Sequence, residues 1–292
     1  MSLLPPELRQ RLRRTRLLAG GALASGGVGE RRSRNKGEGI EFEDFRPYAY
    51  GDDLRRLDPH VYARLGEHVI RQYNVHERLA VTVLLDTSAS MGFGEPSKLR
   101  HAAAIAAGLA FSALSGSDTV RCGALTGGEV RWYPRLSGAG RQEELESWLL
   151  RLEPGGTVDL VRSFSAAAAV LPPNGLLILL SDLWSSGVDE LCDVASDARQ
   201  TLVVVRVLAP EEVDPTFYGT GPVRMVDSET GAELEVELGP SAFELYSTLF
   251  AKSADDIRRQ VLKVGGRLVT VTTATDLGTV FTRSLTDAGI VR

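Results

Sequence analysis

Residues 79–92, Leu79-Ala80-Val81-Thr82-Val83-Leu84-Leu85-Asp86-Thr87-Ser88-Ala89-Ser90-Met91-Gly92, join an apolar run to a polar loop. An apolar run of this length, stopped by an aspartate, predicts a strand buried on both faces of a sheet. Two later runs, 176–180 and 202–208, have the same character, and helical patterns lie between all three. This alternation predicts an α/β fold, a doubly wound, mostly parallel, Rossmann-type sheet with helices on both faces.

The other elements follow from the same periodicities. We expect strands at 119–125, 129–133 and 267–273, and helices at 97–115, 141–152, 158–170, 187–199, 241–264 and 276–288. Residues 223–238 break the alternation and predict a β-hairpin that turns at Glu229-Thr230-Gly231. The α/β domain is therefore expected to span 79–292, with the hairpin as an insertion.

The N-terminal regions differ from this domain in composition. The chain has 292 residues and a net charge of −5, but residues 1–36 carry +7 and the remainder −12. We expect residues 1–36 to form a basic flexible arm, with a short helix at 5–18, and residues 37–78 to form a β-containing appendage packed on the core. A basic arm on an acidic body favours an acidic partner or surface. A solvated, poorly ordered terminus explains the pattern equally well.

Cysteine usage and hydropathy bear on the cellular location. Cys122 and Cys192 have the spacing of neither a disulfide framework nor a zinc site. Two cysteines without a disulfide pattern are typical of proteins in a reducing compartment. No stretch approaches the roughly 18 consecutive apolar residues of a membrane-spanning helix. We therefore expect a cytoplasmic protein without membrane insertion.

Polar residues follow two of the apolar strands. Asp86, Ser88 and Ser90 come after the first run, and Asp182 comes after the second. Thr157 lies between them in the loop before the 158–170 helix. Ligands of such sheets bind at the carboxyl ends of the strands. These hard oxygen groups suit a divalent cation, Mg²⁺ first and Mn²⁺ or Ca²⁺ as alternatives.

Each motif taken singly has a plain structural interpretation. Ser88 and Ser90 could cap the 97–115 helix. The segment Gly155-Gly156-Thr157 could be a turn with an N-cap, and Asp182 could be a turn residue. Their joint occurrence at one sheet edge favours the metal site.

The five residues Asp86, Ser88, Ser90, Thr157 and Asp182 together resemble the metal-ion-dependent adhesion site (MIDAS) of von Willebrand factor A (vWA) domains, with its DxSxS motif. The resemblance implies that the two serines bind the metal directly. It implies that the threonine binds directly or through water, and that the aspartates act largely through water. In that family the cation then binds a carboxylate from a partner.

The upstream segment resembles a narrower family. Glu43-Asp44-Phe45-Arg46-Pro47-Tyr48 and 51–58 (GDDLRRLD), with the 227–231 hairpin, are similar to the domain of unknown function 58 family. These vWA-like proteins are often encoded beside MoxR-type AAA+ ATPases. The resemblance implies a non-catalytic adaptor for such an ATPase in chaperone-like complex assembly or cofactor insertion. One departure is Asp58-Pro59-His60, where many relatives have Asp-Trp-Lys, so no role is carried over to residues 59 and 60.

Three alternatives stay open. Asp86 could be the nucleophile of a magnesium-dependent phosphoryl-transfer enzyme, although Ser88 stands where such folds place a second aspartate. The basic arm could bind nucleic acid, but it lacks interleaved aromatic residues, and we do not expect this partner. An arginine set in the appendage could bind a partner or form structural ion pairs: Arg46, Arg55, Arg56 and Arg64.

Overall fold

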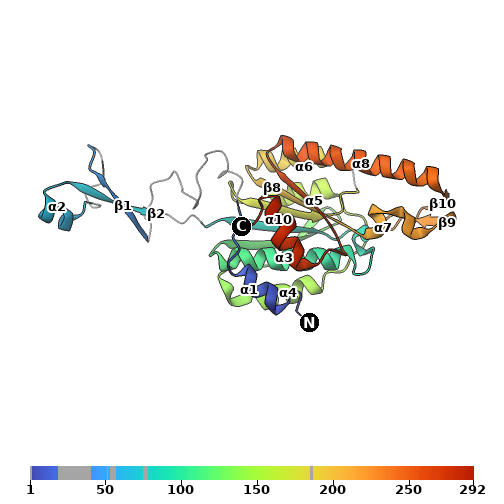
Figure 1. Cartoon of the computed structure of the whole chain (residues 1–292), viewed down its shortest axis with the longest axis horizontal. Helices are drawn as coiled ribbons and strands as arrows, with labels where there is room; N and C mark the ends of the chain where they lie inside the picture. The colour runs from blue at the N-terminus through green and yellow to red at the C-terminus, as the bar shows by residue number, and fades with distance from the viewer. Residues whose placement is uncertain (1, 19–40, 51, 53–56, 75–77, 185–186) are drawn as a thin grey trace. The chain divides into compact units, whose positions relative to one another are not determined.

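The computed structural model describes residues 2–18, 41–50, 52, 57–74, 78–184 and 187–292. The chain divides into two compact units (Figure 1). The larger unit joins Met1–Gly21 to Leu79–Arg292, and the smaller unit is Ala22–Arg78. The predicted boundary at residue 79 therefore coincides with a boundary of the structure.

A seven-stranded sheet forms the centre of the larger unit, in the order β11-β8-β7-β3-β4-β5, with β6 also paired to β4. Strands β11, β8, β7, β3 and β4 are parallel, and β5 and β6 run antiparallel to β4. The prediction of a mostly parallel α/β sheet is confirmed. The strands are β3 (Ala80–Asp86), β4 (Thr119–Thr126), β5 (Glu129–Trp132), β6 (Leu136–Ser137), β7 (Leu176–Ser181), β8 (Thr201–Leu208) and β11 (Arg267–Thr272).

Strand order reverses next to β3. From β3 the chain moves to β4 and β5 on one side, and it then crosses over to β7 on the other side. Such a reversal leaves a crevice at the carboxyl ends of the two strands, because their connections diverge to opposite faces. The residues that follow β3 and β7 therefore meet at the switch point of the sheet.

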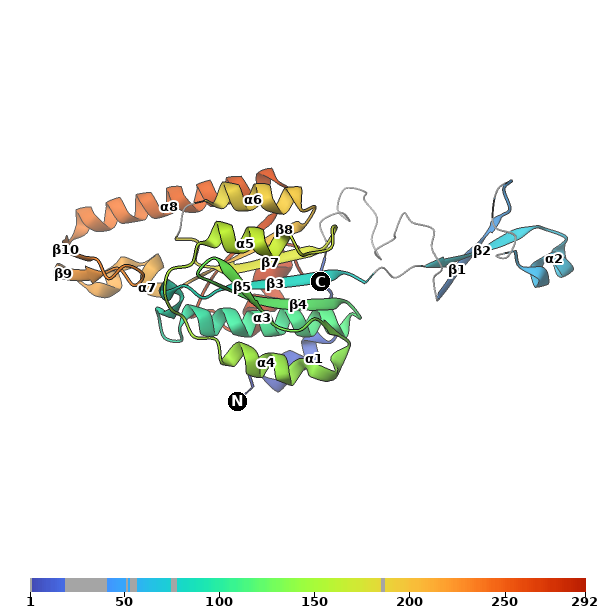
Figure 2. The same ribbon diagram turned by 180° about the vertical axis from the view of Figure 1, so that it is seen from behind.

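Alternate residues of each central strand face opposite cores. Val81, Val83 and Leu85 of β3 contribute to one buried cluster, and Leu84 contributes to the other. One face is covered by α1 (Pro6–Leu12), α3 (Lys98–Ser115), α4 (Gln142–Leu150) and the C-terminal turns, and the other by α5 (Leu160–Ala168), α6 (Val188–Asp197) and α8 (Pro240–Lys263) (Figures 1 and 2). This two-sided burial explains why the strand runs lack polar alternation.

The C-terminal helix differs from its prediction. The expected continuous helix at 276–288 is divided into α9 (Leu277–Thr279), a π-helical turn η5 (Val280–Ser284) and α10 (Leu285–Asp287). The wider turn lets Val280, Phe281 and Leu285 all enter the core. Spacing in the sequence does not distinguish this from a regular helix.

The predicted hairpin is present. Strands β9 (Gly221–Val226) and β10 (Glu233–Leu238) pair antiparallel, with Val226 opposite Glu233. Short helices α7 (Pro210–Val213) and η4 (Pro215–Tyr218) precede the hairpin, and α8 follows it. Both views place the hairpin beside α7 and the first turns of α8, at one end of the larger unit (Figures 1 and 2).

The prediction of a flexible arm is wrong for residues 2–18, because this segment belongs to the core. Leu4, Leu8, Leu12 and Leu17 are buried in the cluster that contains α3. The main chain of Arg16 also pairs with that of Arg292. The spacing of the leucines, and not that of the arginines, determines that this segment packs in the core. Residues 19–36 lie outside the described residues.

The smaller unit contains a two-stranded antiparallel sheet, β1 (Glu41–Pro47) with β2 (Val69–Asn74), and α2 (Pro59–Leu65). Asp58 caps α2, because its carboxylate accepts from the backbone N–H groups of His60 and Val61. Pro59 takes the first helical position, where its missing N–H costs nothing. The Asp58-Pro59-His60 departure therefore has a local structural reason. The packing of this appendage on the core stays a prediction.

Replacement of Leu12 tests the role of the N-terminal segment. Leu12 is 1% exposed, so Leu12→Ala should lower the free energy of unfolding by about 2–5 kcal/mol. Urea denaturation followed by circular dichroism measures this change. The exposed neighbour Arg14, as Arg14→Ala, should shift it by less than about 0.5 kcal/mol. Equal effects of the two substitutions would contradict an integral N-terminal segment.

Candidate metal centre

Asp86 is the last residue of β3, and its carboxylate connects the two strands at the switch point. One oxygen, Oδ1, accepts the backbone N–H of Ser88 at 2.9 Å. The other, Oδ2, accepts the hydroxyl of Ser181, the last residue of β7, at 2.7 Å. Asp86 is 4% exposed. The aspartate is therefore held rigidly at the floor of the site.

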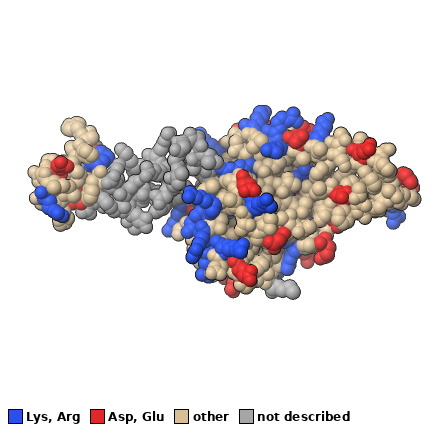
Figure 3. Space-filling view, viewed as in Figure 1, with Lys and Arg blue, Asp and Glu red and all other residues tan. Residues whose placement is uncertain are grey.

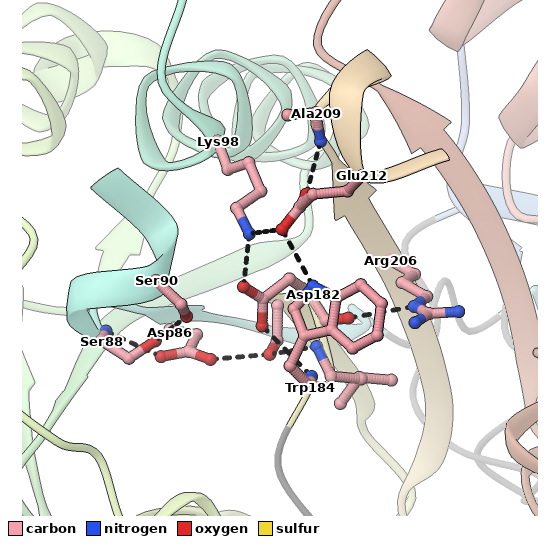
Figure 4. Close-up of polar contacts among 11 residues, drawn as sticks. Asp86, Ser88, Ser90, Lys98, Asp182, Trp184, Arg206, Ala209 and Glu212 are labelled. Atoms are coloured by element: carbon pink, nitrogen blue, oxygen red, sulfur yellow. Dashed lines mark hydrogen bonds and ion pairs between the residues drawn. The ribbon is translucent and has the colours of Figure 1, made fainter. Parts of the chain in front are cut away.

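Two serine hydroxyls lie beside this carboxylate. Ser88 and Ser90 flank the start of η2 (Ala89–Gly92), and their Oγ atoms are 3.0 Å apart (Figure 4). Neither caps α3, because Ser97 is the N-cap and its Oγ accepts from the Arg100 N–H. The capping interpretation of the serines is therefore wrong.

The loop that carries Thr157 lies against the serine loop. Gly155 N–H donates to the Thr87 carbonyl, and Ala89 N–H donates to the Gly156 carbonyl, both at 2.9 Å. Gly156 has φ +65°, which a side chain would disfavour. Thr157 is exposed and forms no side-chain hydrogen bond within the described part of the chain. It does not cap α5 either, since Asp159 does.

Asp182 follows β7 and belongs to a buried ion-pair cluster. The Nζ of Lys98, at the start of α3, lies 2.6 Å from Asp182 Oδ2 and 2.6 Å from Glu212 Oε1. Lys98 is fully buried and Asp182 is 2% exposed. Asp182 Oδ1 accepts the Trp184 N–H at 3.3 Å. Both oxygens of Asp182 therefore already have protein donors.

Glu212 and Arg206 complete the cluster (Figure 4). Glu212 of α7 accepts from Trp184 Nε1 at 2.9 Å and from the Ala209 N–H at 2.7 Å. Arg206 lies within β8, and its Nε donates to the Asp182 carbonyl at 3.0 Å. Its guanidinium lies 5.2 Å from the Trp184 ring, a cation–π distance. These contacts hold the loop after β7 from three sides.

The cluster has an excess of negative charge at Asp86. A single ammonium, Lys98, serves both Asp182 and Glu212, and no described cation pairs with Asp86. Burial raises the pKa of Asp86 above its usual range. Hydrogen bonds from Ser181 and Ser88 lower that pKa, and the charge of Asp182 raises it. A buried carboxylate in this state is stabilised by an added cation.

The donor set fits a hard divalent cation through hydroxyls more than through carboxylates. The described residues contain no group of three or more His, Cys, Asp or Glu side chains arranged to hold a metal. Asp86, Ser88 and Ser90 offer oxygen atoms at one edge of the sheet. Because the oxygens of Asp182 are engaged by Lys98 and Trp184, a role for Asp182 through an intervening water fits better than direct coordination.

The sequence motifs did not predict several residues of this site. Two of these residues, however, stand at positions where a charged side chain is unusual. Arg206 interrupts the apolar strand Leu202-Val203-Val204-Val205-Arg206-Val207-Leu208, where a charge must find buried partners. Lys98 stands in the first turn of a helix, where the helix dipole disfavours a cation. The sequence around Glu212 shows nothing unusual. Its contact with Lys98 depends on how α7 folds back toward α3.

The arginine set in the appendage is only partly described. Arg46 forms a two-contact ion pair with Asp52, Nη1 to Oδ2 at 2.6 Å and Nη2 to Oδ1 at 2.5 Å. This contact agrees with the structural interpretation for that residue. Arg64 is exposed on α2. Arg55 and Arg56 lie outside the described residues, so the partner-binding role of the set stays a prediction.

Comparison with known proteins identifies the family. The chain belongs to the family described as "Protein of unknown function DUF58", whose model matches residues 44–255. Uncharacterized protein Rv1480 of Mycobacterium tuberculosis is 27% identical over 247 residues, covering 82% of this chain and 77% of that protein. Uncharacterized protein Mb1516 of Mycobacterium bovis matches to the same extent. The resemblance to this family is thereby confirmed.

Three solved structures are similar to the chain at low identity. The conserved hypothetical protein BatB from Bacteroides thetaiotaomicron is 15% identical, with a TM-score of 0.45, over 72% of this chain and 98% of that chain. An aerotolerance-related membrane protein from Bacteroides fragilis is 14% identical, with a TM-score of 0.43, over 72% and 99%. An uncharacterized membrane spanning protein from Vibrio fischeri is 14% identical, with a TM-score of 0.26, over 70% and 97%.

These comparisons bear on cellular location. The prediction of a cytoplasmic location is contradicted, because two of the three structures are named as membrane proteins, and we do not retain it. Within the described residues, no helix combines the length and apolar content that crossing a membrane requires.

The ion-pair cluster predicts a large effect of removing its cation. Lys98→Met removes the ammonium that both Asp182 and Glu212 contact and leaves only Arg206 as a nearby cation, so the free energy of unfolding should fall by about 3–5 kcal/mol in chelator at neutral pH. Chemical denaturation measures the change. Arg100→Met, at an exposed site two residues along α3, should change it by less than about 0.5 kcal/mol. A loss no larger than that of Arg100→Met would show that the buried pair contributes nothing.

Proposed function

We propose that the chain binds one divalent cation in a vWA-like, MIDAS-type site and works as a metal-dependent protein-interaction adaptor. The observation that supports this most is the pair of hydroxyl oxygens of Ser88 and Ser90, 3.0 Å apart beside the buried Asp86. Hard divalent cations bind oxygen ligands. The buried Asp86 carboxylate, which has no cation partner among the described residues, and the two serine hydroxyl oxygens provide such ligands. Mg²⁺ is the first candidate, and Mn²⁺ or Ca²⁺ are alternatives.

The residues divide into roles under this proposal. Ser88 and Ser90 would hold the cation directly, and Asp86 and Asp182 would act through water. Thr157 would join from its exposed loop, which two backbone hydrogen bonds hold against the serine loop. When bound, the cation supplies an electrophilic centre for an incoming carboxylate, because few direct charges neutralise it.

The partner follows from this chemistry and from the family resemblance. A protein that presents a carboxylate would complete the site, and a MoxR-type AAA+ ATPase is the proposed partner. The role would be chaperone-like complex assembly or cofactor insertion. The chain has no GxxxxGK[ST] phosphate loop, so ATP hydrolysis would come from that partner.

The phosphoryl-transfer alternative gains no support from the geometry. Both oxygens of Asp86 accept hydrogen bonds, from Ser88 N–H and from the Ser181 hydroxyl, and the side chain is buried. A nucleophilic carboxylate must contact its substrate, and a side chain that is 4% exposed offers little surface for that contact. The leucines of residues 2–18 pack in the core, whereas Arg11, Arg13, Arg14 and Arg16 stay exposed, so this segment presents its arginines from a fixed surface and not from a flexible arm.

Metal titration tests the site. Titration of Mg²⁺ or Mn²⁺ into chelator-stripped protein by calorimetry should give one saturable binding event. Ser88→Ala should abolish it, because it removes an oxygen ligand without altering the fold. Ser147→Ala, an exposed serine on α4, is the matched control and should bind as the wild type does. Absence of binding up to millimolar metal would refute the site.

The adaptor role has its own test. The purified AAA+ ATPase should co-elute with this chain in Mg²⁺ during size-exclusion chromatography, and excess chelator should separate them. Ser88→Ala should separate them in Mg²⁺ as well. A complex that persists in chelator would refute a metal-bridged contact.

A further inference from the structure

Exposed apolar side chains are concentrated in the part of the larger unit that carries the hairpin. Sixteen large apolar side chains are exposed among the described residues, and eight of them lie within residues 211–250. Met225 and Leu234, for example, are directly opposite each other in the hairpin, and both are more than half exposed. Two more of the sixteen, Phe93 and Trp184, follow the loops of the candidate metal centre. Scattered exposed apolar residues are ordinary, but a concentration with a polar rim marks an interaction surface.

The first half of α8 presents part of this surface. Helix α8 has 24 residues, and both of its buried side chains, Ile257 and Val261, lie in its second half. In the first half, Leu245 and Leu249 are one turn apart and are 61% and 57% exposed. Side chains spaced four residues apart form the ridge along which a second helix packs. The first half of α8 therefore has the form of a helix–helix contact without its second helix.

This half of α8 is joined to the loop that follows β7. The Tyr246 hydroxyl donates to the Glu212 carbonyl at 2.5 Å, and the Glu212 side chain accepts from Trp184 Nε1 at 2.9 Å. The Phe250 ring lies 6.0 Å from the Trp184 ring and 6.0 Å from the Tyr246 ring. Because Trp184 stands two residues after Asp182, the exposed surface of α8 is held at the same edge of the sheet as the candidate metal centre.

The charge of this region is strongly negative. Residues 211–250 contain nine acidic residues and one basic residue, Arg224, which pairs with Glu233 at 3.5 Å. On the face shown, the end with the hairpin is mostly uncharged with scattered acidic groups, and most Lys and Arg side chains lie elsewhere (Figure 3). A two-stranded hairpin and single helix turns are thin, so these charges act within the Debye length of about 10 Å at 0.1 M salt. Such a rim attracts a basic partner and repels a membrane with anionic headgroups.

We propose that residues 211–250, together with Trp184, form a docking surface for an amphipathic helix of the partner protein, with an apolar face flanked by Lys or Arg. The apolar face would lie on the ridge of Leu245 and Leu249, and the basic flanks would meet the acidic rim. This inference rests on the proposed adaptor function and adds a second contact beside the metal-bound carboxylate. A single helix makes a small interface, so this contact alone is too weak to hold the complex during chromatography in chelator.

A pair of synthetic helices tests the surface without the metal. The first probe is a fluorescently labelled helix of about 18 residues with Leu on one face and Lys beside it, and the second has Glu in place of Lys. Fluorescence anisotropy measures binding of each probe to the full chain in chelator. The Lys helix should bind about tenfold more tightly than the Glu helix, and high salt should reduce the difference.

Four substitutions at exposed positions locate the binding. Leu249→Ser should weaken binding of the Lys helix about tenfold, because it removes an apolar anchor of the ridge. Glu244→Lys should weaken it about three- to tenfold at low salt and little at high salt. Leu262→Ser, at a 53% exposed site beside Lys263 at the other end of α8, is the control for Leu249. Glu143→Lys, at an exposed site on α4, is the control for Glu244. Both controls should bind as the wild type does.

Thermal melting should be the same for the wild type and the four variants, because all four side chains are exposed. Hydrogen exchange should show protection of residues 240–250 by the Lys helix. Equal binding of the two probes, or equal binding by Leu249→Ser and Leu262→Ser, would overturn the docking surface without bearing on the metal titration. Failure of the metal titration with the predicted helix binding intact would refute the metal site alone. Dimerisation of the chain in sedimentation that Leu249→Ser abolishes would make a second copy the occupant and overturn the partner helix.

Discussion

The hydrogen bond from the Ser181 hydroxyl to Asp86 Oδ2, 2.7 Å long, joins the carboxyl ends of β3 and β7 and is the contact around which the site is arranged. It forms because these strands are parallel neighbours at the reversal of strand order, where chain connections diverge and leave polar ends uncovered. Two fully buried strands could not end on a carboxylate unless its oxygens were satisfied there. The rest of the site follows from this shared edge.

Charge balance separates the two halves of the site. Lys98 bridges Asp182 to Glu212, so that half is closed by the protein itself, with Arg206 and Trp184 packed behind it. Asp86 with Ser88 and Ser90 forms the open half, where negative charge and hydroxyl oxygens lack a cation among the described side chains. A cation proposed here therefore interacts with Asp86 and the serines, with Asp182 as an outer support.

Membership of the DUF58 family defines the class of protein without assigning it an activity. The adaptor proposal leaves one chemical question open, namely which partner carboxylate completes the coordination of the cation.

The sequence by itself determined the parallel sheet, the order of most helices and the position of Asp86, Ser88, Ser90 and Asp182 at strand ends, because apolar runs and their stops are local features. Only the tertiary structure decided that residues 2–18 belong to the core, since five leucines of this segment are buried there despite the arginines between them. It alone brought Lys98 and Glu212 to the site, because these contacts join segments far apart in the chain. Periodicity and motif spacing describe neighbours along the sequence, whereas charge pairing at a sheet edge depends on which loops fold back over it.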